Sequence, residues 1–160
     1  MKWTTHLAGA TAASLAFTAC HNLPLPHALG VTACAMAASL LPDIDTCTSK
    51  AGHSIAPISF SIQLFIGHRT LFHAPIIYLV SYGLLMLHFP EANQFITAGA
   101  IGIASHILLD MLNPGGIPFL WPYPKRFRLA SIRSNGILDH LLGVFLSIVA
   151  VALIAESLFG

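Results

Sequence analysis

Residues 137–159 read ILDHLLGVFLSIVAVALIAESLF, an almost unbroken apolar run that decides the class of fold. A helix needs about 17–25 apolar residues to cross the hydrocarbon core of a bilayer, and this run is long enough. Four more apolar runs precede it, at residues 3–20, about 27–41, 71–89 and 95–112. The pattern predicts one all-α domain over residues 1–160, a polytopic membrane helix bundle with about five transmembrane helices.

The composition supports a membrane protein and excludes several other classes. The chain is 56% hydrophobic and only 8% charged, whereas soluble domains carry about 25% charged residues. That excludes an ordinary cytosolic enzyme and a disordered segment. The net charge of +1 gives no sign of a nucleic-acid partner, so the expected partner is the lipid bilayer.

The basic residues predict the orientation of the bundle. With five crossings, the N-terminus and the loops at 42–70 and 113–136 share one side, and all seven Lys and Arg residues fall there. The positive-inside rule then makes that side cytoplasmic. A segment at about 53–67 is too short to span and is expected to be interfacial or re-entrant. Phe17-Thr18-Ala19-Cys20 resembles a lipoprotein cleavage site, but the phenylalanine favours an uncleaved helix.

Histidine is the unusual residue, because nine histidines exceed the six carboxylates. Ionisable groups in or beside apolar spans are costly and by default mark function. In the predicted topology, eight ionisable residues gather at the cytoplasmic boundary of the membrane. They are His6, Asp43, Asp45, His68, Arg69, His73, His106 and Asp110. Asp139 and His140 open the fifth helix at the same level, where a first-turn carboxylate also has a structural use, so their membership stays open.

His106 and Asp110 form the sharpest pair, since four residues on a helix place them on one face about 6 Å apart. They either bind a divalent cation together or join helices by a hydrogen bond. Asp43 and Asp45 follow the second helix, where carboxylates oppose the helix dipole, and this favours contact with a metal or a substrate. Arg69 suits a phosphate, or serves only as a topology charge.

The order of these motifs resembles a known family. Thr5-His6, Leu41-Pro42-Asp43-Ile44-Asp45, His68-Arg69-Thr70-Leu71-Phe72-His73, Ser105 to Asp110 and Trp121-Pro122 follow one another along the chain. This order is similar to that of the YdjM/YbcI-type bacterial inner-membrane proteins, which are described as metal-dependent hydrolases. The family often has His-Arg-Gly-x-Thr-His where this chain has Thr70-Leu71-Phe72 between its two histidines.

The ligand order is also similar to that of zinc-dependent phospholipase C enzymes. That resemblance implies one or more Zn²⁺ ions held by His6, Asp45, His68, His106 and Asp110. Asp43 and His73 are additional candidates without so close a counterpart in those enzymes. The resemblance further implies hydrolysis of a phosphoester in a lipid or other amphiphile at the cytoplasmic face of the inner membrane. Asp43 would hold or deprotonate the attacking water, and Arg69 would stabilise phosphoryl charge. The alternative is a non-enzymatic metal-binding, sensing or structural membrane protein.

Overall fold

The computed structural model describes residues 1–45, 49, 52–53, 57, 60 and 71–159, and its elements are helical. The five α-helices and three short 3₁₀ turns are α1 (Trp3–Cys20), α2 (Leu25–Ala38), η1 (Leu41–Asp45), η2 (Leu71–His73), α5 (Pro75–His88), η3 (Pro90–Ala92), α6 (Asn93–Asp110) and α7 (Ile137–Phe159). Within these ranges there is no strand, and one isolated antiparallel bridge joins Ile117 to Phe127. The predicted all-α helix bundle is confirmed.

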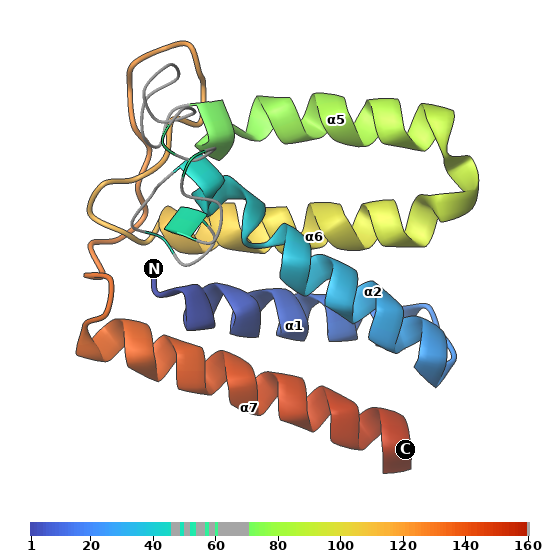
Figure 1. The fold of residues 1–160 in the computed structure, drawn as a ribbon. Coiled ribbons are helices and arrows are strands. Elements are labelled where there is room, and N and C mark those ends of the chain that lie inside the picture. The colour runs from blue at the N-terminus through green and yellow to red at the C-terminus, as the bar shows by residue number, and fades with distance from the viewer. Residues whose placement is uncertain (46–48, 50–51, 54–56, 58–59, 61–70, 160) are drawn as a thin grey trace.

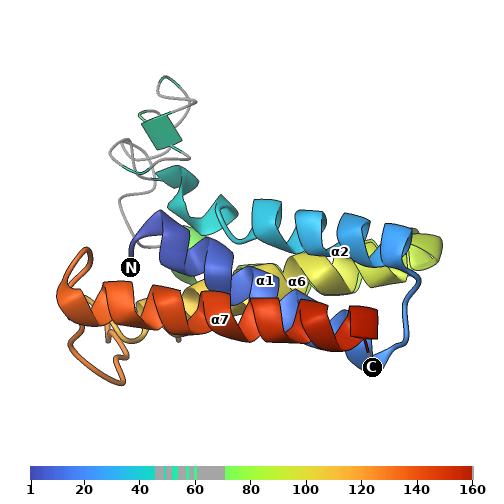
Figure 2. The same cartoon turned by 90° about the horizontal axis from the view of Figure 1, so that it is seen from below.

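The helices run side by side, with α6 in the middle of the bundle (Figure 1). Helix α6 packs against α1, α2 and α5, while α7 packs along α1. Seen from below, α7 lies along α1, and α2 lies on the other side of α1 (Figure 2). Helix α5 contacts the rest of the bundle mainly through α6, and none of its residues is buried.

The described loops gather at the two ends of the bundle as the predicted topology requires. The N-terminus, η1, η2 and residues 111–136 lie at one end, which we call the loop end (Figure 1). The short connections after α1 and α5 lie at the opposite end with the C-terminus. The predicted interfacial segment at about 53–67 falls mostly outside the described residues.

Two helix boundaries differ from the predicted runs. Helix α2 ends at Ala38, and the last residues of the 27–41 run lead into η1. The 71–89 run does not begin as a helix, because the ring of Pro75 disfavours helical backbone at Ala74, which is extended at φ −89° and ψ 118°. His73 therefore lies on a separate turn before α5, and not on the helix itself.

Within the described part of the chain, three segments are long and apolar enough to cross a membrane: Leu25–Asp45, Pro90–Asp110 and Ile137–Ser157. Helix α5 is apolar but shorter. The outer face of α7 is what a bilayer would cover, since Leu141, Val144, Phe145 and Ile148 are all exposed. The crossing of the bilayer by all five helices stays a prediction.

The close contact between α2 and α6 positions part of the loop end. A methyl group at Gly102 would overlap the carbonyl oxygen of Ala35, so only glycine permits this approach. Ala35 also belongs to the small buried core with Val31 and Ala98. One turn further along each helix, Ser39 and His106 meet, and the glycine contact thus sets the distance between them.

Candidate metal centre

Six of the eight predicted site residues lie in the described part of the chain, and the structure brings all six together at the loop end. They come from four separate segments: His6 from α1, Asp43 and Asp45 from η1, His73 from η2, and His106 and Asp110 from α6. His68 and Arg69, the other two predicted residues, lie outside the described residues. Helix packing thus unites residues that are up to 104 positions apart (110 − 6).

Four side chains form the centre of this group, and we call them the quartet: Asp43, His73, His106 and Asp110. Nε2 of His73 lies 3.8 Å from Oδ1 of Asp43 and 3.5 Å from Oδ2 of Asp110. Nε2 of His106 lies 3.7 Å and 3.8 Å from the same two oxygens. Ligand atoms of a tetrahedral zinc site, with bonds of about 2.0–2.1 Å, stand about 3.3–3.4 Å apart. The four nitrogen–oxygen distances are close to that spacing, and donor atoms of Asp43, His73 and His106 all lie within 4.8 Å of one another.

The protonation pattern of His106 favours a cation in the quartet. Its Nδ1 donates a hydrogen bond to the carbonyl oxygen of Ser39 at 2.7 Å, so the neutral ring has its lone pair on Nε2. That lone pair faces the carboxylates of Asp43 and Asp110 and has no hydrogen-bond partner among the described residues. Two acceptors facing a buried third acceptor repel one another, and a metal ion among them removes the repulsion.

His73 has carboxylates on both ring nitrogens. Nδ1 lies 3.6 Å from Oδ2 of Asp45, on the side of the ring away from the quartet. Burial lowers the pKa of His73, but the carboxylates of Asp110 and Asp45 outweigh it and raise that pKa above its ordinary value. Asp45 is positioned to orient His73 in the way that carboxylates orient metal-bound histidines, while Asp43 points its oxygen into the quartet.

His6 adds a second group beside the quartet. Its ring stacks on that of His106 at 3.8 Å between centroids, and its Nε2 lies 3.4 Å from Oδ1 of Asp110. Asp110 therefore turns one oxygen towards His6 and the other towards His73 and His106. Donor atoms of His6, His106 and Asp110 all lie within 4.8 Å of one another.

The four side chains of the quartet differ in how much of their surface is exposed. The side chains of His73, His106 and Asp110 are at most 1% exposed, whereas that of Asp43 is 17% exposed. Among the described residues, Asp43 therefore forms the exposed edge of the quartet.

The comparisons with known proteins show the family of the chain. A family model described as YdjM inner membrane protein matches residues 1–159. The chain belongs to the YdjM family. The inner membrane protein YdjM of Escherichia coli K12 is 42% identical over 95 residues, which cover 56% of this chain and 48% of that protein. The uncharacterized protein YvsG of Bacillus subtilis 168 is 34% identical over 99 residues, or 61% of each chain.

The YdjM-family chain therefore spans about half the length of the first relative (48%) and about three fifths of the second (61%). No solved structure matches it. Membership in a family of inner membrane proteins agrees with the three membrane-length segments of the described residues, and the names of these two relatives state no catalytic activity.

Three residues of the YdjM-family site were not predicted from the sequence. Asn113 donates from Nδ2 to Oδ1 of Asp110 at 2.6 Å, and the amino group of Met1 lies 2.7 Å from the same oxygen. Asn113 is three positions after Asp110, and side chains at this spacing are neighbours on a helix. The contact of Asn113 with Asp110 could therefore have been predicted from the sequence. Ser39 acts through its backbone carbonyl, which no residue pattern reveals.

Asp139 and His140, whose membership was open, do not join the quartet. Asp139 is fully buried and accepts hydrogen bonds from the backbone N–H groups of Lys2 and Asn135 and from the Thr5 hydroxyl, at 2.7–2.9 Å. These contacts fasten the start of α1 to the start of α7. His140 is exposed, and its Nδ1 bonds to the carbonyl oxygen of Gly136.

Proposed function

We propose that this YdjM-family chain is a membrane-bound metal-dependent hydrolase that cleaves a phosphoester in an amphiphilic or lipid substrate. The observation that carries the proposal is the quartet: two imidazole nitrogens and two carboxylate oxygens, from three segments, at the spacing of one divalent ion. Zn²⁺ suits this donor set because imidazole and carboxylate are among its ordinary ligands. The loop end faces the cytoplasm in this proposal, since the basic residues lie on that side.

His73, His106, Asp110 and Asp43 would hold the ion, with His6 beside them as a further candidate ligand. A bound divalent ion lowers the pKa of water towards neutrality and polarises a phosphoryl oxygen. Asp45 would keep His73 in position, and Ser39 would keep the lone pair of His106 directed inwards.

The open side of the quartet suggests how this chain handles the water. Asp43 is the least buried of the four, and its second oxygen would accept a hydrogen bond, and then a proton, from a water that enters there. Arg69 follows His68 in the sequence and would neutralise charge that develops on the phosphoryl oxygens. The extent of burial also suits a closed, structural metal site, which makes a non-enzymatic metal protein the second candidate.

The test is turnover by protein purified in detergent and supplied with zinc or manganese. A chromogenic phosphodiester and short-chain phospholipids are the substrates, and released phosphate ester is measured. Wild type should turn over at least one of them, and Asp110→Asn should abolish turnover. Glu156→Gln, an exposed carboxylate at the other end of the bundle, is the matched control and should leave it unchanged. Metal bound without any phosphoester turnover would favour the non-enzymatic candidate.

A further inference from the structure

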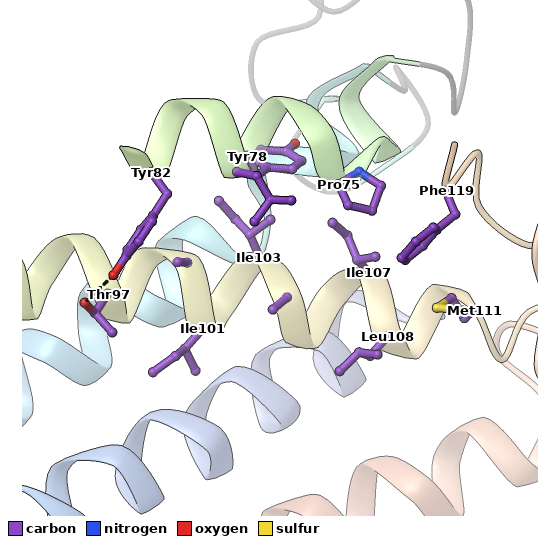
Figure 3. A pocket seen from close by; sticks show the side chains of 13 residues that line it. Pro75, Tyr78, Tyr82, Thr97, Ile101, Ile103, Ile107, Leu108, Met111 and Phe119 are labelled. Atoms are coloured by element: carbon purple, nitrogen blue, oxygen red, sulfur yellow. Dashed lines mark hydrogen bonds between the residues drawn. The ribbon is translucent and has the colours of Figure 1, made fainter. Parts of the chain in front are cut away.

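An apolar groove lies between α5 and α6, and the proposed chemistry does not use it (Figure 3). Its volume is about 490 Å³, within the roughly 300–1,000 Å³ of small-ligand sites. Side chains from both helices line it, among them Leu79, Ile103, Ile107 and Leu108, and Phe119 closes one end.

The groove offers nothing to a polar ligand. Its only lining hydroxyls belong to Tyr78, Tyr82 and Thr97, all in the described part of the chain. The Tyr78 hydroxyl donates to the carbonyl oxygen of Phe72 at 2.7 Å, and those of Tyr82 and Thr97 lie 3.5 Å apart. Since these hydroxyls already have partners and the other lining side chains are apolar, the occupant must be a hydrocarbon.

The dimensions and position of the groove fit one acyl chain. It extends along α6 from Thr97 to Met111, which at 1.5 Å per residue is about 21 Å. One leaflet of hydrocarbon is about 15 Å deep, half of the roughly 30 Å core. Most of the α6 side belongs to the candidate span Pro90–Asp110, and Leu79 and Leu108 on its rim are 66% and 58% exposed. The groove therefore lies where bilayer lipid has direct access to it.

One end of the groove adjoins the metal centre. Met111 follows Asp110, Ile107 follows His106, and Pro75 comes two residues after His73. Figure 3 shows Pro75, Ile107 and Met111 together near Phe119, while Tyr82 and Thr97 lie at the opposite end. A chain lying in the groove would bring its polar end to the same end of the bundle as the quartet.

We propose that this groove binds one acyl chain of a membrane phospholipid and thereby presents the headgroup end of the lipid to the metal centre. The role of this lipid as a substrate rests on the proposed function. The inference names the substrate as a phospholipid whose phosphoester lies near its acyl chains. Binding itself needs only the groove. The walls supplied by α5 and α6 hold the chain, and entry is sideways from the bilayer between Leu79 and Leu108.

The experiment is photolabelling in vesicles of phosphatidylethanolamine and phosphatidylglycerol that contain a phosphatidylethanolamine with a diazirine halfway along one acyl chain. Labelled residues are located by mass spectrometry of peptides. We expect label concentrated on residues 75–82 and 97–111. Ala104→Trp, which fills the groove, should lower this label about tenfold, the effect of excluding roughly two methylene groups from an apolar site. Ala100→Phe is a second, smaller obstruction with the same expected direction.

Ala152→Trp on the exposed part of α7 is the control and should not change the groove label. Bound metal is measured in every variant to show that the bundle is intact. Label spread evenly over α5, α6 and α7, or unaffected by both groove variants, would overturn the inference. Groove label without phosphoester turnover would leave the lipid site standing and refute the hydrolase, whereas turnover without groove label would do the reverse.

Discussion

Among single residues, Asp43 and Asp45 show how two close neighbours in the sequence take different places. Asp43 turns an oxygen into the quartet, 3.8 Å from Nε2 of His73, while Asp45 faces Nδ1 of the same ring at 3.6 Å. The resemblance to zinc phospholipases makes Asp45 a ligand and leaves Asp43 for the water. The geometry instead favours Asp43 as the ligand and Asp45 as the residue that orients His73.

The two carboxylates can be separated by metal affinity. Asp45→Asn should weaken metal binding about 10–100-fold, the usual effect of losing an orienting partner, while Asp43→Asn should remove tight binding altogether. Competition with a chromogenic chelator measures both affinities. Loss of binding in Asp45→Asn with retention in Asp43→Asn would reverse the two assignments.

What was predictable at this scale depended on local spacing. His106 and Asp110 are one helical turn apart, and Nε2 and Oδ2 lie 3.8 Å from each other, as the spacing predicts. The contribution of Ser39 was not predictable, because it depends on which carbonyl of α2 comes beside α6. Which of the two aspartates in Asp43-Ile44-Asp45 faces inwards depends on the 3₁₀ turn they form, and loop chemistry alone left that open.

Among the elements, the crossing of α2 and α6 is the most constrained contact. Gly102→Ala should destabilise the bundle by about 1–3 kcal/mol, because the added methyl group overlaps the Ala35 carbonyl and the helices must separate. Gly83→Ala on α5 is the matched control, since nothing lies within 4 Å of a Cβ there. Thermal unfolding in detergent should show a loss only for Gly102→Ala. Equal stability of the two variants would contradict this crossing.

The contact between α1 and α7 gives a second prediction. Asp139→Asn replaces one carboxylate oxygen by an N–H donor where three donors already converge, and should cost about 1–3 kcal/mol of stability. Metal content per folded chain should stay at the wild-type level, because Asp139 is outside the quartet. Thermal unfolding and elemental analysis of the same sample test both parts. Metal loss in a folded Asp139→Asn protein would place this residue in the site.

The positions of the helices were largely predictable from the sequence. A long apolar run indicates a helix that is covered by lipid or by other helices, whichever of the two covers it. The start of the third run was not. Hydropathy continues through Leu71 and Phe72, but Pro75 separates these residues from α5 and leaves His73 on its own turn. That turn matters for the site, since it lets His73 approach Asp43 and Asp45.

For the whole molecule, the loop end should face the cytoplasm. A Cys-free variant with Arg128→Cys should resist a membrane-impermeant maleimide in intact cells, and one with Glu91→Cys should react with it. Both should react after the membrane is permeabilised. The opposite labelling pattern would place the metal centre on the outer side.

The bundle unites at one point residues from α1, η1, η2 and α6, and its central claim is that they hold a metal ion. Elemental analysis of detergent-purified protein tests this most directly, with wild type beside His106→Ala/Asp110→Ala. We predict at least one tightly held transition-metal ion per wild-type chain and none in the folded double variant. Wild type that stays free of metal after zinc and manganese are supplied would contradict the account and leave the quartet as polar packing between helices.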